Sequence, residues 1–181
     1  MSPQRYLGLD PGYGRLGYAV VEQRGAQWVL VDVGCVETLA SLAFEERLVL
    51  VHNALDEILE RWKPQEASLE TLYFSKNVKT AMQVAEARGV LRLTLALAGV
   101  PAFEIAPNAV KLALTGSGGA TKDQVGRMVV RLLGLKEMPK PDDAADAVAL
   151  ALAGLRSRPM RQQLAAAKAG KPKSIAKGKR P

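Results

Sequence analysis

Short runs of apolar residues at the start of the chain favour β-strands. Residues 6–9 form the first run and end at Asp10, after which a Pro-Gly pair favours a turn, because proline fixes φ and glycine tolerates positive φ. Residues 16–21 and 28–37 form two further β-rich runs. Three successive strands with short connections predict an antiparallel meander.

The hydrophobic spacing becomes helical beyond the third strand. Between residues 44 and 62 apolar positions recur every three or four residues, the spacing of an amphipathic helix. The remaining expected elements are strands over 66–74 and 102–106 and helices over 77–98, 107–114, 121–133 and 142–155. A meander followed by alternating helices and strands predicts an α/β fold, with a mixed five-stranded sheet flanked by helices.

Charge is divided unevenly along the chain. The net charge is +7, but residues 156–181 contain nine Lys or Arg and no acid, which leaves 16 bases against 18 acids in residues 1–155. The same C-terminal stretch has no aromatic residue and is rich in Ala, Lys, Gly and Pro, a composition that favours disorder. We expect a folded domain over 1–158 and a disordered basic tail over 159–181 that can contact DNA phosphates.

Several classes of protein are disfavoured by composition. The single cysteine, Cys35, allows no internal disulfide, as expected in a reducing compartment. No apolar run reaches the roughly 18 to 20 residues that span a bilayer, and the first residues lack the pattern of a secretory signal. We therefore expect a cytoplasmic protein with no membrane partner.

Acidic residues occur where apolar ones are expected. Asp10 ends the first strand, Glu70 lies in the middle of the fourth, and Asp146 is enclosed by alanines and a valine. If the first and fourth strands are neighbours, Asp10 and Glu70 meet, and clustered carboxylates need a cation or a raised pKa. Hard oxygen ligands favour Mg²⁺ or Mn²⁺, and two such ions about 4 Å apart are a common device for phosphoryl displacement. The alternatives are a turn aspartate at Asp10 and a helix-dipole role for Asp142.

Four stretches, in chain order, resemble the motifs of RuvC-type Holliday-junction resolvases, the crossover junction endodeoxyribonucleases: GLDPGYGRLGYAVVE, ETLYFSKN, EARGV and DDAADAVALALA. The resemblance covers residues 5–155. It implies an RNase H-like fold, a homodimer, and paired symmetric nicks in a four-way DNA junction during recombination and repair. It also implies Mg²⁺ or Mn²⁺ as cofactor, with two ions per site, a branch-migration helicase complex as partner, and a bacterial, nucleoid-associated location.

The resemblance assigns roles to individual residues. The metal-binding and catalytic acids would be Asp10, Glu70, Asp143 and Asp146. Lys111 and Lys122 would be catalytic and bind DNA, since a lysine near the scissile phosphate offsets charge in the transition state. The further DNA-binding residues would be Tyr73 or Phe74, which would stack on bases, and Lys76. From the residues alone, both catalytic lysines could be solvated surface residues and both aromatic rings could be core residues. Because Asp142 directly precedes the matched acid, the third ligand is open between Asp142 and Asp143.

Three other functions compete with this one. The motif GLDPGYGRLG also resembles the phosphate loop of actin-like sugar kinases and chaperone ATPases, but those proteins carry a second copy that this chain lacks. A related RNase H-like nuclease could act on RNA or another branched nucleic acid. A non-catalytic junction-binding module would not need the full set of acids. Gly89 lies inside the helix over 77–98, where glycine costs about 1 kcal/mol relative to alanine, so we expect close packing there, for example at a dimer interface.

Overall fold

The computed structural model of the chain describes residues 4–12, 14–71 and 78–169. Its elements follow the order that the sequence predicts. The strands are β1 (Gln4–Pro11), β2 (Arg15–Arg24), β3 (Gln27–Glu37), β4 (Glu66–Glu70) and β5 (Ala102–Ile105). The helices are α1 (Phe44–Trp62), α2 (Val78–Leu97), α3 (Pro107–Thr115), α4 (Lys122–Leu133) and α5 (Asp142–Ala169).

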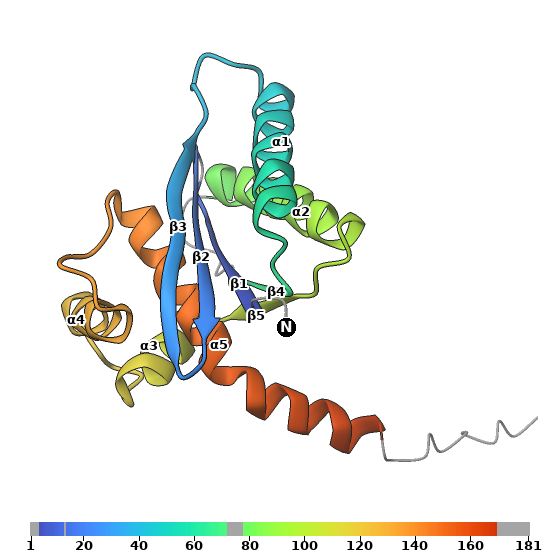
Figure 1. Cartoon of the computed structure of the whole chain (residues 1–181). Helices are drawn as coiled ribbons and strands as arrows, with labels where there is room; N and C mark the ends of the chain where they lie inside the picture. Colours follow the sequence, from blue (N-terminus) through green and yellow to red (C-terminus); the bar gives the residue numbers. More distant parts are fainter. Residues whose placement is uncertain (1–3, 13, 72–77, 170–181) are drawn as a thin grey trace, which may run out of the picture.

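The strands form one five-stranded mixed sheet in the order β3-β2-β1-β4-β5 (Figure 1). The first three strands pair antiparallel as a meander. β4 pairs parallel with β1, and β5 pairs parallel with β4. The predicted mixed sheet is therefore confirmed, and β1 lies at its centre between an antiparallel and a parallel neighbour.

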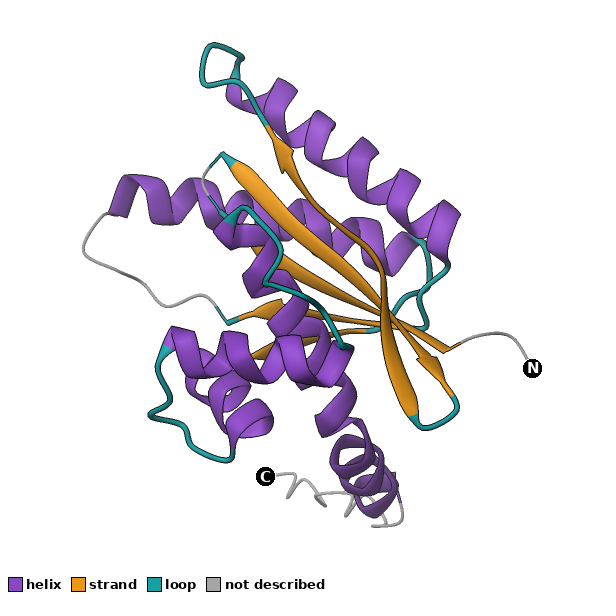
Figure 2. Cartoon of the chain, turned by 60° about the vertical axis from the view of Figure 1, so that its left-hand side comes forward, coloured by secondary structure: helices purple, strands orange, loops and turns teal. Residues whose placement is uncertain are grey.

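Helices cover both faces of this sheet (Figures 1 and 2), and a hydrophobic core lies on each face. Alternate side chains of a strand point to opposite faces. Leu7 and Leu9 of β1 accordingly pack with apolar residues of α1 and α2, whereas Tyr6 packs with those of α3, α4 and α5. The sheet is thus packed against helices on both faces.

Helix α5 crosses the sheet at very short range because glycines and alanines meet there. A Cβ added to Gly8 of β1 would lie 2.0 Å from the main-chain oxygen of Ala147. A Cβ added to Gly154 of α5 would lie 2.3 Å from the ring of Tyr6. Larger residues at these positions would push the helix away from the sheet, so small residues fix the position of α5.

The ends of the helices follow local rules that the sequence already contains. Thr121 caps α4 by accepting a hydrogen bond from the main-chain nitrogen of Gln124, whose side chain accepts one from the main-chain nitrogen of Thr121. Helix α1 ends at Trp62, and Lys63 then adopts φ 48°, ahead of Pro64. Gly99, at φ 69°, follows α2 as the expected stop.

The C-terminal helix corrects one prediction. It continues to Ala169, whereas the sequence predicts that it ends at residue 155 and that disorder begins at residue 159. Arg161 explains part of the extension: its guanidinium lies 2.7 Å from the carboxylate of Glu66 and 3.1 Å from the hydroxyl of Tyr6. Arg158 lies 2.8 Å from the same carboxylate. The helix therefore includes residues 159–169 of the predicted tail, and the rest of that tail lies outside the described residues.

Two further boundaries differ from expectation. β4 ends at Glu70 rather than at residue 74, and the later part of the expected strand lies outside the described residues. The expected N-cap of α2, Asn77, also lies outside them. Within the described part of the chain, no helix combines the length and hydropathy needed to cross a membrane.

Candidate active site

Asp10 and Glu70 come together because their strands are parallel neighbours. Leu9 of β1 pairs in register with Leu69 of β4, so Asp10 and Glu70 are the next residues on adjacent strands. Both leucines point into the core under α1 and α2, and alternation turns the two following acids to the face that α5 covers. The predicted adjacency of the first and fourth strands is confirmed.

A glycine on β2 lets α5 begin beside Asp10. Gly17 is the register partner of Asp10, and a Cβ added to it would lie 2.0 Å from the main-chain oxygen of Asp143. The first turns of α5 therefore start directly against this part of the sheet. Asp143 and Asp146 are three residues apart, so they lie on one face of the helix, and both are half-buried.

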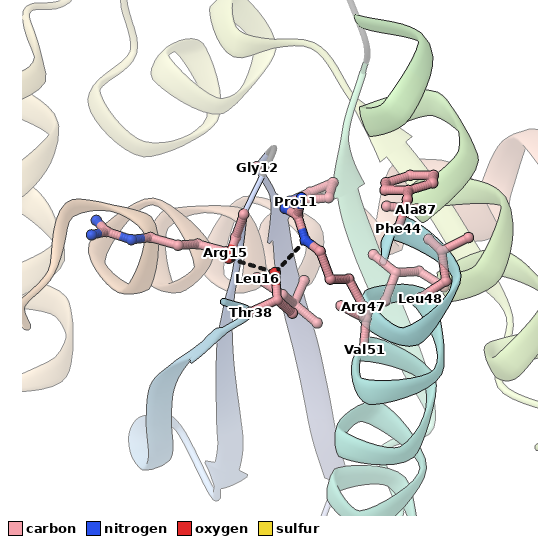
Figure 3. A pocket seen from close by; sticks show the side chains of 12 residues that line it. Pro11, Gly12, Arg15, Leu16, Thr38, Phe44, Arg47, Leu48, Val51 and Ala87 are labelled. Atoms are coloured by element: carbon pink, nitrogen blue, oxygen red, sulfur yellow. Dashed lines mark hydrogen bonds between the residues drawn. The ribbon is translucent and has the colours of Figure 1, made fainter. Parts of the chain in front are cut away.

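The turn between β1 and β2 is held from the neighbouring helix. Figure 3 shows Thr38 and Arg47 beside a small pocket between this turn and α1. The hydroxyl of Thr38 donates a hydrogen bond of 3.1 Å to the main-chain carbonyl of Gly14 and accepts one of 3.0 Å from Nε of the buried Arg47. This chain of contacts fixes the loop that follows Asp10.

The carboxylate of Asp10 is in an environment that disfavours its charge. Burial is the largest cause, and the carboxylate of Glu70 is the next; together with smaller contributions they raise the pKa of Asp10 to about 7. Asp146 and Asp143 act in the same direction, while the ammonium group of Lys122 acts against it. The acids of three separate elements therefore interact electrostatically at one point, as clustered carboxylates do.

Glu70 is held in place by an arginine of α2. Burial, and secondly the carboxylate of Asp146, raise the pKa of Glu70, whereas the guanidinium of Arg88 lowers it. Arg88 is buried, donates a hydrogen bond to the main-chain carbonyl of Glu70, and lies 3.1 Å from the carboxylate of Glu104 on β5. The end of β4 is thus tied to both its neighbouring strand and the helix above it.

Lys122, the first residue of α4, faces the acids of α5. Its ammonium group lies 3.1 Å from Asp146 and 3.2 Å from Asp142. Burial acts to lower the pKa of Lys122, but the hydrogen bonds to Asp146 and Asp142 outweigh it and raise this pKa overall. Asp143 has a different basic neighbour, since Arg15 of β2 lies 3.8 Å from its carboxylate.

An open cleft of about 280 Å³ is lined by several of these charged residues. Glu70 and Asp146 lie in its wall together with Lys111 of α3 and Lys122 of α4. Apolar residues of α3, α4 and α5 complete the wall. The structure therefore brings both predicted lysines to the same cleft as two of the four predicted acids.

The donor set fits a divalent cation of the magnesium type. Carboxylates supply hard oxygen ligands without thiols or imidazoles, and the raised pKa of Asp10 reflects charge that a cation would compensate. Among the described residues, no three acidic, histidine or cysteine side chains are gathered closely enough to hold an ion as they stand. Lys122 and Arg15 meanwhile pair with Asp146 and Asp143.

Some predicted site residues fall outside the described part of the chain, and some residues that support the site were not predicted. The predicted DNA-binding residues Tyr73, Phe74 and Lys76 lie outside the described residues, so their roles stay predictions. The sequence patterns predicted no role for Gly17 or Arg88. The available signals were a glycine within a β-rich run and an arginine inside a helix, next to the glycine of the EARGV motif.

A family model described as "Crossover junction endodeoxyribonuclease RuvC" matches residues 6–154. The chain belongs to the RuvC family. A RuvC from Roseiflexus sp. (strain RS-1) is 48% identical over 160 residues, which are 88% of this chain and 95% of that relative. A RuvC from Thermotoga maritima is 48% identical over 151 residues, which are 83% of this chain and 90% of the relative.

Solved structures agree with this assignment. The structure titled "T. thermophilus RuvC in complex with Holliday junction substrate" superposes with a TM-score of 0.83 at 35% identity, covering 87% of this chain and 96% of that one. The yeast mitochondrial Holliday junction resolvase Ydc2 superposes with a TM-score of 0.65 at 14% identity, a likeness of fold alone. The RNase H-like fold is thereby confirmed, and RuvC-type nucleases are metal-dependent enzymes.

Proposed function

We propose that the protein is a structure-selective endonuclease that resolves four-way DNA junctions by paired, symmetric, metal-dependent nicks during recombination and repair. One observation carries this proposal: Asp10, Glu70 and Asp146 converge from three elements where Lys111 and Lys122 line the same cleft. Membership of the RuvC family, and a likeness to a RuvC whose structure is titled as a complex with Holliday junction substrate, support the choice of substrate.

We propose that the four acids of the site hold Mg²⁺ or Mn²⁺, with two ions per site: Asp10, Glu70, Asp143 and Asp146. Bound ions of this kind activate water and stabilise the leaving oxygen in phosphodiester hydrolysis. The chain's own contribution is to hold the acids rigidly: Asp10 through the β1–β2 turn, Glu70 through Arg88, and the other two through the close packing of α5. Such positioning is what preorganised sites require.

The two lysines act on the phosphate rather than on the ions. Lys122 balances the charge of Asp146 before substrate binds, and its ammonium group is placed to pair with a phosphate that enters the cleft. Lys111 lies in the same cleft and, among the described residues, forms no ion pair. Both can offset the negative charge that develops during hydrolysis. Stacking by Tyr73 or Phe74, and a phosphate contact by Lys76, belong to the same proposal.

A second copy of the chain completes the enzyme, because a two-fold protein presents two identical sites to a nearly two-fold junction. Helix α2 supports this: Met82, Leu93 and Leu97 are 56%, 59% and 75% exposed on one stripe. Gly89 lies on the same stripe, and no atom lies within 4 Å of a Cβ added to it. Among the described residues the close packing expected at Gly89 is thus not made within one copy, and we assign it to a dimer interface.

Two finer assignments rest on the family rather than on the geometry. We infer that the branch-migration helicase complex of the same pathway is a partner, since paired nicking follows branch migration. We also infer that the enzyme works in the bacterial cytoplasm on nucleoid DNA, as its RuvC relatives from Roseiflexus and Thermotoga suggest.

The test is cleavage of a labelled mobile four-way junction. We expect purified protein to nick two opposite strands symmetrically with Mg²⁺ or Mn²⁺, to leave ligatable ends, and to be inactive with a chelator. Linear duplex and linear RNA serve as substrate controls. Efficient cleavage of linear RNA would instead favour an RNA-directed nuclease, and junction binding without nicking under all metal conditions would favour a non-catalytic module.

A further inference from the structure

Helix α4 forms a basic side of an otherwise acidic domain. Residues 122–140, which comprise α4 and the segment after it, contain five bases and two acids, a balance of +3, whereas the whole domain over 1–158 contains 18 bases and 18 acids, a balance of zero. The rest of that domain therefore carries −3. Helix α4 starts at Lys122 in the catalytic cleft and lies beside β3 and α5 (Figure 1). Arg127 and Arg131 follow Lys122 on this helix.

Two open hollows lie along this side and share one arginine. The first, of about 720 Å³, lies between the loop after α3 and α4, and Arg127 and Arg131 line it. The second, of about 540 Å³, lies between α4 and the β2–β3 turn, and Arg131 and Arg156 line it. Neither lining includes an acidic residue. Arg127 pairs with Asp123, whereas exposed Arg131 and Arg156 form no ion pair among the described residues.

The spacing of these arginines from the site matches duplex DNA. Arg131 follows Lys122 by nine residues on α4, which is about 14 Å of helix. Arg156 follows Asp146 by ten residues on α5, which is about 15 Å. Lys122 and Asp146 line the catalytic cleft, and Arg131 and Arg156 line the second hollow. Helices α4 and α5 therefore both run from the cleft to this hollow. At about 3.4 Å per base pair, this separation corresponds to about four base pairs.

We propose that Arg131 and Arg156, with Arg127 beside them, bind the phosphate backbone of the duplex arm that leaves the active site, about three to five base pairs from the nick. The assignment rests on the proposed junction-cleaving function. The absence of acids from both linings and the free guanidinium groups favour a polyanion over a protein partner. These contacts position the arm and carry no base information.

The test is the salt dependence of junction binding by the double variant Arg131→Gln/Arg156→Gln. Each lost phosphate contact lowers the salt slope by about one unit and, at 0.15 M salt, weakens binding roughly fivefold. We expect a slope lower by about two units and affinity lower by about 25-fold, with an unchanged nicking rate at saturating protein. The matched control is Arg61→Gln, an exposed arginine of α1 on the other face of the sheet, which should bind as the wild type does.

A chemical probe locates the contact. Neutral methylphosphonates placed three to five base pairs from the cleavage site should weaken binding by the wild type and by Arg61→Gln, and should have little further effect on the double variant. Equal weakening in all three proteins, or an unchanged salt slope in the double variant, would overturn the assignment. A wild type that cleaves no junction would instead count against the proposed function, whatever the slopes.

Discussion

The guanidinium of Arg88 donates a hydrogen bond to the main-chain carbonyl of Glu70. Arg88 lies on the buried side of α2, and the next residue, Gly89, is exposed. The catalytic end of β4 is therefore anchored to α2, the helix that we assign to the dimer interface. The exposed side of α2 is therefore connected to Glu70 through the contacts of Arg88.

The first prediction concerns this anchor. Arg88→Leu removes a buried charged donor from Glu70 and from Glu104, and we expect the free energy of unfolding to fall by about 2 kcal/mol. The nicking rate should fall more than the affinity for the junction, because Glu70 loses its position while the DNA-binding residues keep theirs. Urea unfolding and single-turnover cleavage measure both, and Arg88→Lys should restore part of the rate. Wild-type cleavage by Arg88→Leu would exclude a positioning role.

The second prediction separates the acids of α5. Asp146→Asn should abolish nicking and keep junction binding, because it removes a proposed ligand. Asp142→Asn is the matched control: its side chain is 89% exposed, and it touches the same Lys122. We expect this control to retain most activity in the same cleavage assay. If Asp142→Asn is inactive and Asp143→Asn is active, the ligand assignment is displaced by one residue.

The third prediction concerns pH and Asp10 in metal-free protein. Folding raises the pKa of Asp10 to about 7, so between its ordinary value and pH 7 the folded state binds more protons than the unfolded state. Stability therefore falls as pH rises through this window. Between pH 5 and pH 8 we expect the wild type to lose about 2 to 3 kcal/mol relative to Asp10→Asn. Urea unfolding with a chelator measures this difference, and Mg²⁺ should reduce it; parallel pH profiles would contradict it.

The fourth prediction tests the stripe on α2. Leu93→Glu places a charge in the proposed dimer interface, and Gly89→Leu adds bulk where two helices would approach. Both variants should fold, dissociate to monomers in sedimentation experiments, and nick the two strands independently. Leu39→Glu is the control, since Leu39 is equally exposed, at 68%, but lies in the loop before α1. A dimer that persists in both α2 variants would place the interface elsewhere.

The fifth prediction separates the role of residues 158–169 from that of residues 170–181. A chain ending at residue 169 keeps Arg158 and Arg161, so its melting temperature should equal that of the full chain. It also loses five of the nine C-terminal bases, so its binding to plain duplex should show a lower salt slope. A chain ending at residue 157 leaves the carboxylate of Glu66 without either arginine and should lose about 2 kcal/mol of stability. Equal melting temperatures of both truncations would contradict the anchoring role.

Local chemistry was enough to predict most elements of this protein. Apolar spacing located α1, the Thr121 capping box started α4, and Gly99 followed the end of α2, because each of these signals acts within a few residues. The order of strands and helices then favoured a mixed sheet. The acids Asp10, Glu70 and Asp146 were conspicuous in the sequence because a carboxylate among apolar residues has a desolvation cost that must be compensated.

Only the tertiary structure decided how these parts meet. The length of α5 could not be predicted from its composition, because Arg161 stabilises the extension through Glu66, which is 95 residues away. Arg88 supports Glu70 from 18 residues away, and Gly17 allows Asp143, 126 residues away, to approach the sheet. The sequence by itself determined the chemical character of the site, since that depends on residue type. Its geometry was decided by close packing between segments remote in sequence, which no local pattern encodes.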